Sequence, residues 1–391
     1  MTLFRSRFSL NYSLFVLALA SLAAACGKES GSPGGASTGS GGQMTGSGGG
    51  GAGTGGAAGQ TGGSGGAGGQ TSGSGGQTVL DSGALDTPPS TVDATQPGVD
   101  GGYNGPGKLV CNPGTDGNGF HDMTAQGIPA PTDYTLRAGV KQGTLTATAM
   151  FTSTIYPGPK FPYRIYTSAN YSKDKPAVFM TFGDGSEYIN NFKVPTLLDN
   201  LTDEGVVPPA VVLFIDPPLP EPERHTIYYD PPTEKYGMFL FTEIIPAVIE
   251  PNYPVSKDPN AWVTGGHSAS GEVGWSVLWH TDRYHKFFGH NCSYGAANVA
   301  MYGNVDWAKL IMTSPKRDIR VSLVTAPVGR DLVDQRGDWT KINQGVADAL
   351  AAKGNDYRFI IAPGGHDGGT NSRPDFPTAM RWMFKGCSFA N

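Results

Sequence analysis

One short stretch of the chain, residues 264–271 (Thr-Gly-Gly-His-Ser-Ala-Ser-Gly), restricts the possible folds more than any other. An extended run, 260–263, precedes it, and an apolar run that we predict as a buried helix, 271–279, follows it. A strand, a tight Gly-rich turn with a central serine and then a helix is the setting that projects a serine hydroxyl from the edge of a sheet. Glycine allows such a turn to close, because it adopts backbone angles that a Cβ atom disfavours. The stretch therefore predicts an α/β architecture with Ser268 at the turn.

The turn departs from the usual Gly-x-Ser-x-Gly pattern at one position. Ser270 stands where that pattern has its second glycine, and Gly271 comes one residue later. A Gly/Ser loop in which a serine caps the following helix is an equally good interpretation of the stretch alone. The residues downstream favour the first interpretation.

Apolar runs alternate with amphipathic segments on both sides of this turn. The run 210–215 (AVVLFI) is short and continuously apolar, as in a parallel strand that is buried on both faces. Strands that alternate with helices predict a mostly parallel central sheet with helices on both faces. The predicted strands are 143–156, 161–166, 177–182, 210–215, 287–292, 321–326 and 358–361, and a first hairpin is expected to precede the main sheet. The predicted helices are 234–250 and 339–352.

Polar residues just after strands are candidates for a site, because ligands in such folds bind at the carboxyl ends of the strands. Asp331 follows the strand 321–326, and His366 lies in a Gly-Gly-His-Asp-Gly-Gly loop after the strand 358–361. With Ser268 they have the chain order Ser, Asp, His that is typical of α/β-hydrolase triads. In a triad the histidine takes the serine proton, and the acid fixes the imidazole tautomer.

Residues near this set receive other assignments. Asp334 is the alternative acid, but Asp331 lies closer to the end of its strand. His267 is expected to point away from the serine. An oxyanion requires two N–H donors, and we expect Ala269 to supply one and the loop 182–186 the other. The remaining histidines after the turn are interpreted as surface or structural residues: His280, His285 and His290.

The beginning of the chain has the features of an export signal. Two arginines precede an apolar run, 14–25, which is too short to span a membrane, so residues 1–25 are predicted to be a signal peptide. The segment Leu-Ala-Ala-Ala-Cys that ends at Cys26 resembles a bacterial lipobox, which implies lipidation of Cys26 and an exported, membrane-anchored lipoprotein. Ordinary cleavage after an Ala-x-Ala site is the alternative, and it falls at the same bond.

A segment rich in Gly, Ser and Thr, 26–106, follows the signal. It contains too few apolar residues to offset the entropy of ordering the chain, so we predict a disordered linker. The remaining residues, 107–391, are enough for one large α/β domain. The formal net charge of -5, without a long basic run, does not favour a nucleic-acid partner.

Three cysteines remain in the predicted domain. An exported protein can form a disulfide, and the candidate pair is Cys111 and Cys387, which lie near the two ends of the domain. Cys292 is then a buried thiol. The chain has no C-x-x-C or H-E-x-x-H pattern, so we expect neither a metal nor another cofactor.

The domain also resembles a bacterial esterase family that includes enterochelin esterases and the feruloyl and acetyl esterases of carbohydrates. The similarity covers most of 177–384 and rests on 182–185 (FGDG), 229–230 (YD), 235–240 (KYGMFL), 265–268 (GGHS), 329–332 (GRDL), 337–339 (GDW), 364–366 (GGH) and 379–382 (AMRW). Two places differ: the family usually has glycines after the nucleophile, and its loop before the Tyr-Asp pair usually carries Arg and Glu where this chain has His225 and Tyr228.

The resemblance implies an α/β-hydrolase fold with Ser268 as nucleophile, His366 as base and Asp331 as acid. It further implies an oxyanion hole made by backbone groups at Asp184, Gly185 and Ala269. The implied activity is hydrolysis of a small-molecule or carbohydrate ester of a sugar, a phenolic acid or a siderophore-like compound. A non-catalytic surface binding protein on the same fold and an acyltransferase are the alternatives.

Overall fold

A computed structural model describes residues 103–390 of the chain, apart from 113–116, 221–222, 230, 296–302 and 304. The predicted signal peptide, Cys26 and nearly all of the predicted linker lie outside the described residues. Within the described part, no helix combines the length and the apolar character that crossing a membrane requires.

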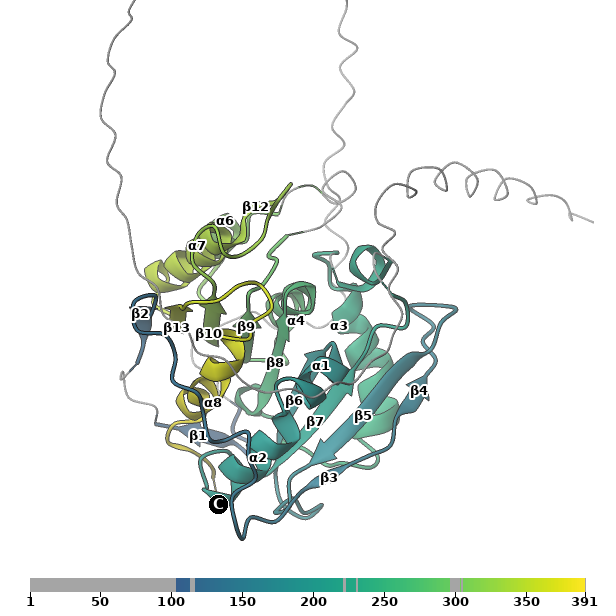
Figure 1. Ribbon diagram of the computed structural model, residues 1–391. Coiled ribbons are helices and arrows are strands. Elements are labelled where there is room, and N and C mark those ends of the chain that lie inside the picture. Colours follow the sequence, from purple (N-terminus) through teal and green to yellow (C-terminus); the bar gives the residue numbers. More distant parts are fainter. Residues whose placement is uncertain are drawn as a thin grey trace, which may run out of the picture. The chain divides into compact units, whose positions relative to one another are not determined.

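A ten-stranded sheet forms the centre of the described domain (Figure 1). The strands from β2 to β7 pair in parallel, and β5 with its partners β3 and β4 adds an antiparallel edge. In spatial order they are β2 (Gly119–Asp122), β13 (Asp356–Ile361), β10 (Arg320–Thr325), β9 (Lys286–His290), β8 (Trp262–His267), β6 (Val178–Gly183), β7 (Ala210–Ile215), β5 (Phe161–Thr167) and β3 (Thr144–Leu145), with β4 (Ala149–Phe151) also on β5. The prediction of a mostly parallel sheet is confirmed.

Helices cover both faces of this sheet, as two neighbouring residues of β9 demonstrate. The Phe287 ring packs against Trp275 of α4 (Ala269–His280), with ring centroids 5.4 Å apart. The Phe288 ring packs against Phe376 of α8 (Ser372–Met383) at 5.1 Å. Successive side chains of a strand point to opposite faces, so α4 and α8 lie on opposite sides of the sheet. This is why β8, β9 and β10 are buried along their whole length.

Several elements differ from the sequence-based expectation. The predicted helix 234–250 consists of α3 (Lys235–Phe239) and a π-helical segment, η2 (Leu240–Ile249). Pro246 lies inside that segment, and its missing N–H prevents a regular α-helical ladder. The region 143–156 holds only the short strands β3 and β4. The helices α1 (Gly185–Asn190), α2 (Val194–Asp203), α6 (Trp307–Thr313) and α8 were not predicted, whereas α7 (Trp339–Ala352) was.

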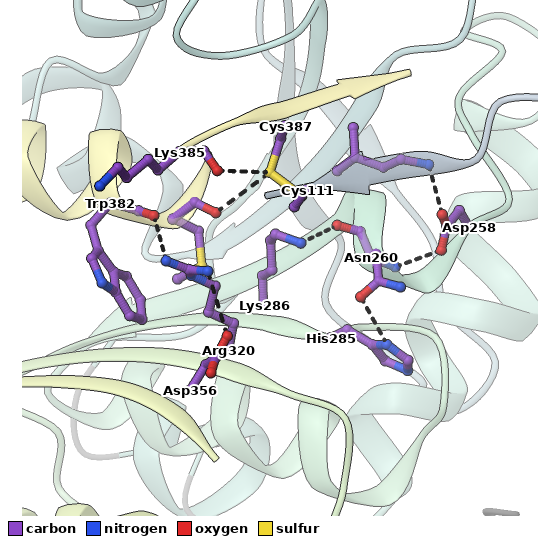
Figure 2. The surroundings of a disulfide bond; sticks show 12 residues. Cys111, Asp258, Asn260, His285, Lys286, Arg320, Asp356, Trp382, Lys385 and Cys387 are labelled. Carbon is purple, nitrogen blue, oxygen red and sulfur yellow. Dashed lines mark hydrogen bonds and ion pairs between the residues drawn. A yellow bond between two sulfur atoms is a disulfide. The ribbon is translucent and has the colours of Figure 1, made fainter. Parts of the chain in front are cut away.

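The two ends of the domain are joined by the disulfide between Cys111 and Cys387 (Figure 2). β1 (Leu109–Cys111) pairs antiparallel with β14 (Cys387–Phe389), and the two cysteines are register partners. Cys292 is a free, buried thiol. The proposed pairing and the role of Cys292 are therefore confirmed. A small hairpin of β11 (Val333–Asp334) and β12 (Gly337–Asp338) lies in the connection after β10.

Candidate active site

Ser268 occupies a sharp turn between β8 and α4. Its backbone angles are φ 58° and ψ −125°, and α4 begins at the next residue. A positive φ is unfavourable for a residue with a side chain, so the surrounding structure must hold it. The Ser268 N–H donates to the His290 carbonyl at the end of β9 (2.9 Å). The predicted strand, turn and helix are all present.

Ser270 closes this turn. Its hydroxyl accepts a hydrogen bond from the His267 N–H (3.0 Å) and donates one to the His267 carbonyl (2.8 Å). A Cβ atom on Gly266 would lie 2.1 Å from the Ser270 carbonyl group, so no other residue fits there. The serine that stands in place of the usual glycine therefore stabilises the turn.

The glycine that comes one residue late has a separate reason. A Cβ atom on Gly271 would lie 2.4 Å from the Cys292 sulfur. The first turn of α4 thus packs directly on the residues that follow β9. The Ser270-Gly271 order therefore suits this turn: the Ser270 hydroxyl bonds the turn, and Gly271 leaves space for the Cys292 sulfur.

The loops after three strands bring Ser268, His366 and Asp331 together. The His366 Nε2 atom lies 2.9 Å from the Ser268 Oγ, and its Nδ1 atom lies 2.8 Å from the Asp331 Oδ1. A carboxylate can only accept, so Nδ1 carries a proton, and in the neutral imidazole the Ser268 hydroxyl donates to Nε2. Such an arrangement can move a proton from the serine to the imidazole.

Asp331 is held in its ionised form. Burial disfavours the charge, but hydrogen bonds from His366, the Thr325 hydroxyl (2.8 Å) and the Leu332 N–H (2.8 Å) outweigh it and lower the carboxyl pKa. Thr325 is the last residue of β10, so the strand itself fixes the acid. A charged acceptor at this place stabilises a His366 imidazolium.

Asp334, the alternative acid, has other partners. Its carboxylate pairs with the Arg336 guanidinium and accepts from the Trp339 indole N–H (3.2 Å). The Trp339 ring in turn packs edge-on against the His366 ring, with centroids 4.9 Å apart. Asp334 therefore supports the wall beside the histidine, and it is Asp331 that contacts the imidazole.

His267 does not point away from the site, so that expectation is wrong. Its Nε2 atom lies 2.7 Å from the His366 carbonyl oxygen, and its Nδ1 atom lies 3.2 Å from a Glu187 oxygen on α1. Both partners only accept, so both nitrogens carry protons. Burial opposes this cation, but the Glu187 carboxylate outweighs it and raises the His267 pKa. His267 thereby ties α1 to the loop that carries His366.

The predicted oxyanion donors lie at the starts of two helices. Ala269 is the first residue of α4, and Gly185 is the first residue of α1. The N–H groups of a first helical turn have no partner inside the helix. Asp184 differs, because its backbone N–H donates to the Tyr229 hydroxyl (2.9 Å). Its carboxyl is buried, which raises its pKa to about 6 although Arg224 opposes the shift.

A hollow of about 390 Å³ opens over Ser268. Three carboxylates, one guanidinium, two serines and two histidines line it: Asp184, Glu187, Asp216, Arg224, Ser186, Ser268, His267 and His366. The predicted site residues did not include Glu187, Asp216 and Arg224, because their positions depend on how the loops fold. Among the described residues, no cluster of His, Cys, Asp and Glu has the form of a metal site.

No protein-family model and no curated protein sequence matches the chain. Solved structures do match it. An enterochelin esterase from Shigella flexneri matches with a TM-score of 0.52 and 18% identity over 65% of this chain and 61% of that chain. The enterobactin esterase of the same organism, solved in the presence of enterobactin, matches with a TM-score of 0.51 and 17% identity over 63% of this chain and 60% of that chain. A ferulic acid esterase matches with 0.50 and 15% over 62% and 98%.

The chain has the α/β-hydrolase fold. The resemblance that the sequence indicated is therefore confirmed at the level of fold. The match spans about three fifths of the length of the enterochelin and enterobactin esterases. At this identity the α/β-hydrolase fold follows from the comparison, and the activity has to be argued from the site itself.

Replacing Ser270 tests its part in the turn. Ser270→Ala leaves the buried His267 N–H without its acceptor, and we expect a loss of about 1–3 kcal/mol in the free energy of unfolding. Ser276→Ala, in the same helix, removes one bond to the Thr233 carbonyl and is the matched control. Urea unfolding of both variants measures the difference. Equal losses in the two variants contradict this role of Ser270.

The pair of His267 and Glu187 predicts a pH-dependent stability. Because the His267 pKa is raised, its contribution is complete below about pH 6.5 and is lost as the pH rises through the folded-state value. Glu187→Gln should therefore cost about 1–3 kcal/mol at pH 6 and distinctly less at pH 9. Glu204→Gln is the control, because Glu204 pairs only with arginines, Arg137 and Arg381, among the described residues. A Glu187→Gln loss that is equal at both pH values, by urea unfolding, overturns the prediction.

Proposed function

We propose that the chain is a serine esterase that hydrolyses a carboxylic ester through an acyl-enzyme on Ser268. One observation carries the proposal: a continuous chain of hydrogen bonds connects the Ser268 hydroxyl, the His366 imidazole and the Asp331 carboxylate. The hydroxyl stands on a strained turn at the start of a helix, where a substrate carbonyl can approach it. The esterases that share the fold support the same class of reaction.

In the proposed mechanism, His366 takes the Ser268 proton as the oxygen attacks the ester carbonyl. Asp331 stabilises the imidazolium, which then gives the proton to the leaving alcohol. Water, activated by the same imidazole, releases the acid from the serine. Backbone N–H groups of Ala269 and Gly185 stabilise the oxyanion, and the Asp184 N–H joins them only when the Tyr229 hydroxyl releases it.

We further propose an ester of a sugar, a phenolic acid or a siderophore-like compound as substrate. Among these the charges of the hollow favour an uncharged ester. Three carboxylates line it against two cations, the Arg224 guanidinium and the His267 imidazolium. Asp216 accepts only from the Ser186 N–H and hydroxyl among the described residues. An anionic substrate would be repelled at such a mouth.

A non-catalytic binding protein is less compatible with the turn. That alternative requires a distorted backbone around Ser270, whereas the Ser270 hydroxyl bridges the turn and the three side chains are hydrogen-bonded to one another.

We also propose export as a lipoprotein through Cys26, on the sequence features of residues 1–26. A flexible linker of the length of 26–106 has a root-mean-square span of about 50 Å, enough to hold the domain clear of a membrane.

Covalent labelling tests the proposal directly. We expect a fluorophosphonate to add once to residues 27–391 of the chain, at Ser268, as read by intact mass and peptide mapping. The adduct should disappear in Ser268→Ala and in His366→Ala and persist in Ser276→Ala. A folded wild-type chain that takes no label would exclude an activated serine.

The choice of acid is tested by two isosteric variants. Asp331→Asn should lower kcat on a model phenyl ester about 10³–10⁴-fold, because the histidine tautomer and its cation lose their support. Asp334→Asn, which faces Arg336 and Trp339, should lower kcat less than about 10-fold. Thermal melting of both variants controls for folding. A larger loss of kcat in Asp334→Asn than in Asp331→Asn would assign the acid to Asp334.

A further inference from the structure

A second hollow, of about 440 Å³, lies at the amino ends of the central strands, the opposite end from Ser268. Lys286, Arg320 and Asp356 are the first residues of β9, β10 and β13, and they lie side by side in the sheet register. Residues of β1 with the disulfide cysteine Cys111 form another wall (Figure 2). The hollow shares no residue with the one over Ser268.

The lining of this hollow is cationic. Five basic side chains face two carboxylates: Lys108, Lys286, Lys316, Arg317 and Arg320 against Asp318 and Asp356. The two carboxylates lie in solvent: the side chains of Asp318 and Asp356 are 88% and 50% exposed. Lys286 and Arg320 are only 3% and 7% exposed. The inner surface therefore carries positive charge, and the compensating negative charge lies at the rim.

Lys286 is a buried cation with little compensation. Its ammonium donates to the Asn260 carbonyl, its one hydrogen-bond acceptor among the described residues. Burial, followed by the charge of Arg320, lowers the Lys286 pKa to about 8. The charges of Asp258, Asp318 and Asp356 counteract this shift. The Asp258 carboxylate already accepts the N–H groups of Leu109 and Asn260, and the other two side chains are solvent-exposed. Buried charges are normally paired, and among the described residues this ammonium has a carbonyl acceptor but no carboxylate within ion-pair distance.

Arg320 has the same deficit at one atom. Its guanidinium stacks over the Trp382 ring (4.1 Å), donates to the Trp382 carbonyl (2.9 Å) and lies 3.5 Å from Asp356. The Nε atom is buried and has no hydrogen-bond partner among the described residues. Two adjacent buried cations with unused donors form a site that an anion with several oxygens would complete.

We propose that this hollow binds a phosphate group, with Lys286 and Arg320 as its inner ligands and Lys108 and Lys316 at the rim. A phosphate offers several oxygens to an ammonium and a guanidinium at once, which a single carboxylate cannot match. The volume lies in the range of small-molecule sites and leaves space for the organic part of a phosphate ester. A phospholipid headgroup and a free phosphate or phosphate ester both carry this group, so both are sources that the test must separate.

Titration of the full-length chain with inorganic phosphate tests the site. We expect saturable one-to-one binding by calorimetry and a phosphate-dependent rise in Tm. Lys286→Met should weaken binding at least 10-fold and remove that rise, without lowering the Tm in phosphate-free buffer. Lys309→Met, which removes an exposed lysine outside the hollow, should bind as the wild type does.

A rim variant and a vesicle-binding experiment complete the test. If Lys286→Met does not fold, the rim double variant Lys108→Gln/Lys316→Gln should still fold and bind phosphate about 10-fold more weakly. Cosedimentation with phosphatidylcholine vesicles, with and without phosphatidic acid, identifies a headgroup as the source when binding requires phosphatidic acid and Lys286. The proposal fails if the folded wild type binds neither probe, or if binding survives both the Lys286 and the rim substitutions.

Discussion

The positive φ of Ser268 is the constraint on which the site depends. The sheet supplies one half of the support, since the Ser268 N–H is bonded to the last residue of β9. The first turn of α4 supplies the other, through the Ser270 hydroxyl and the close contact of Gly266 with the Ser270 carbonyl group. Strained backbone persists only where its surroundings over-determine it. β8, β9 and α4 must therefore all be in place before the Ser268 hydroxyl can face His366.

Two neighbouring histidines show how environment separates chemical roles. His366 donates to a carboxylate at one nitrogen and faces a hydroxyl at the other, which is the arrangement of a general base. His267 meets an acceptor at each nitrogen, so it is set up as a cation. The rings stack with centroids 5.2 Å apart. The His267 ring bonds to the His366 carbonyl oxygen, and both nitrogens of the His366 ring remain available for Ser268 and Asp331.

Sequence patterns were sufficient for the features that depend on local chain order. The strand, turn and helix around Ser268 and the positions of Asp331 and His366 after strands could be predicted because parallel strands end at one edge. The short helices α1 and α2 could not, since the residue before each helix, Asp184 or Lys193, has a positive φ and its side chain does not cap the helix. The partners of His267 and the cations beside Cys111 come from segments far apart in the chain. Their proximity is decided by packing, which leaves no pattern in the sequence.

The disulfide between Cys111 and Cys387 has a topological consequence. The bond closes the polypeptide into a ring that contains Ser268, Asp331 and His366. A protease that cuts one peptide bond in an exposed loop of this ring leaves both pieces covalently linked. Fragments of such a nicked molecule separate only after reduction, so a first cut opens a loop without releasing either part of the site.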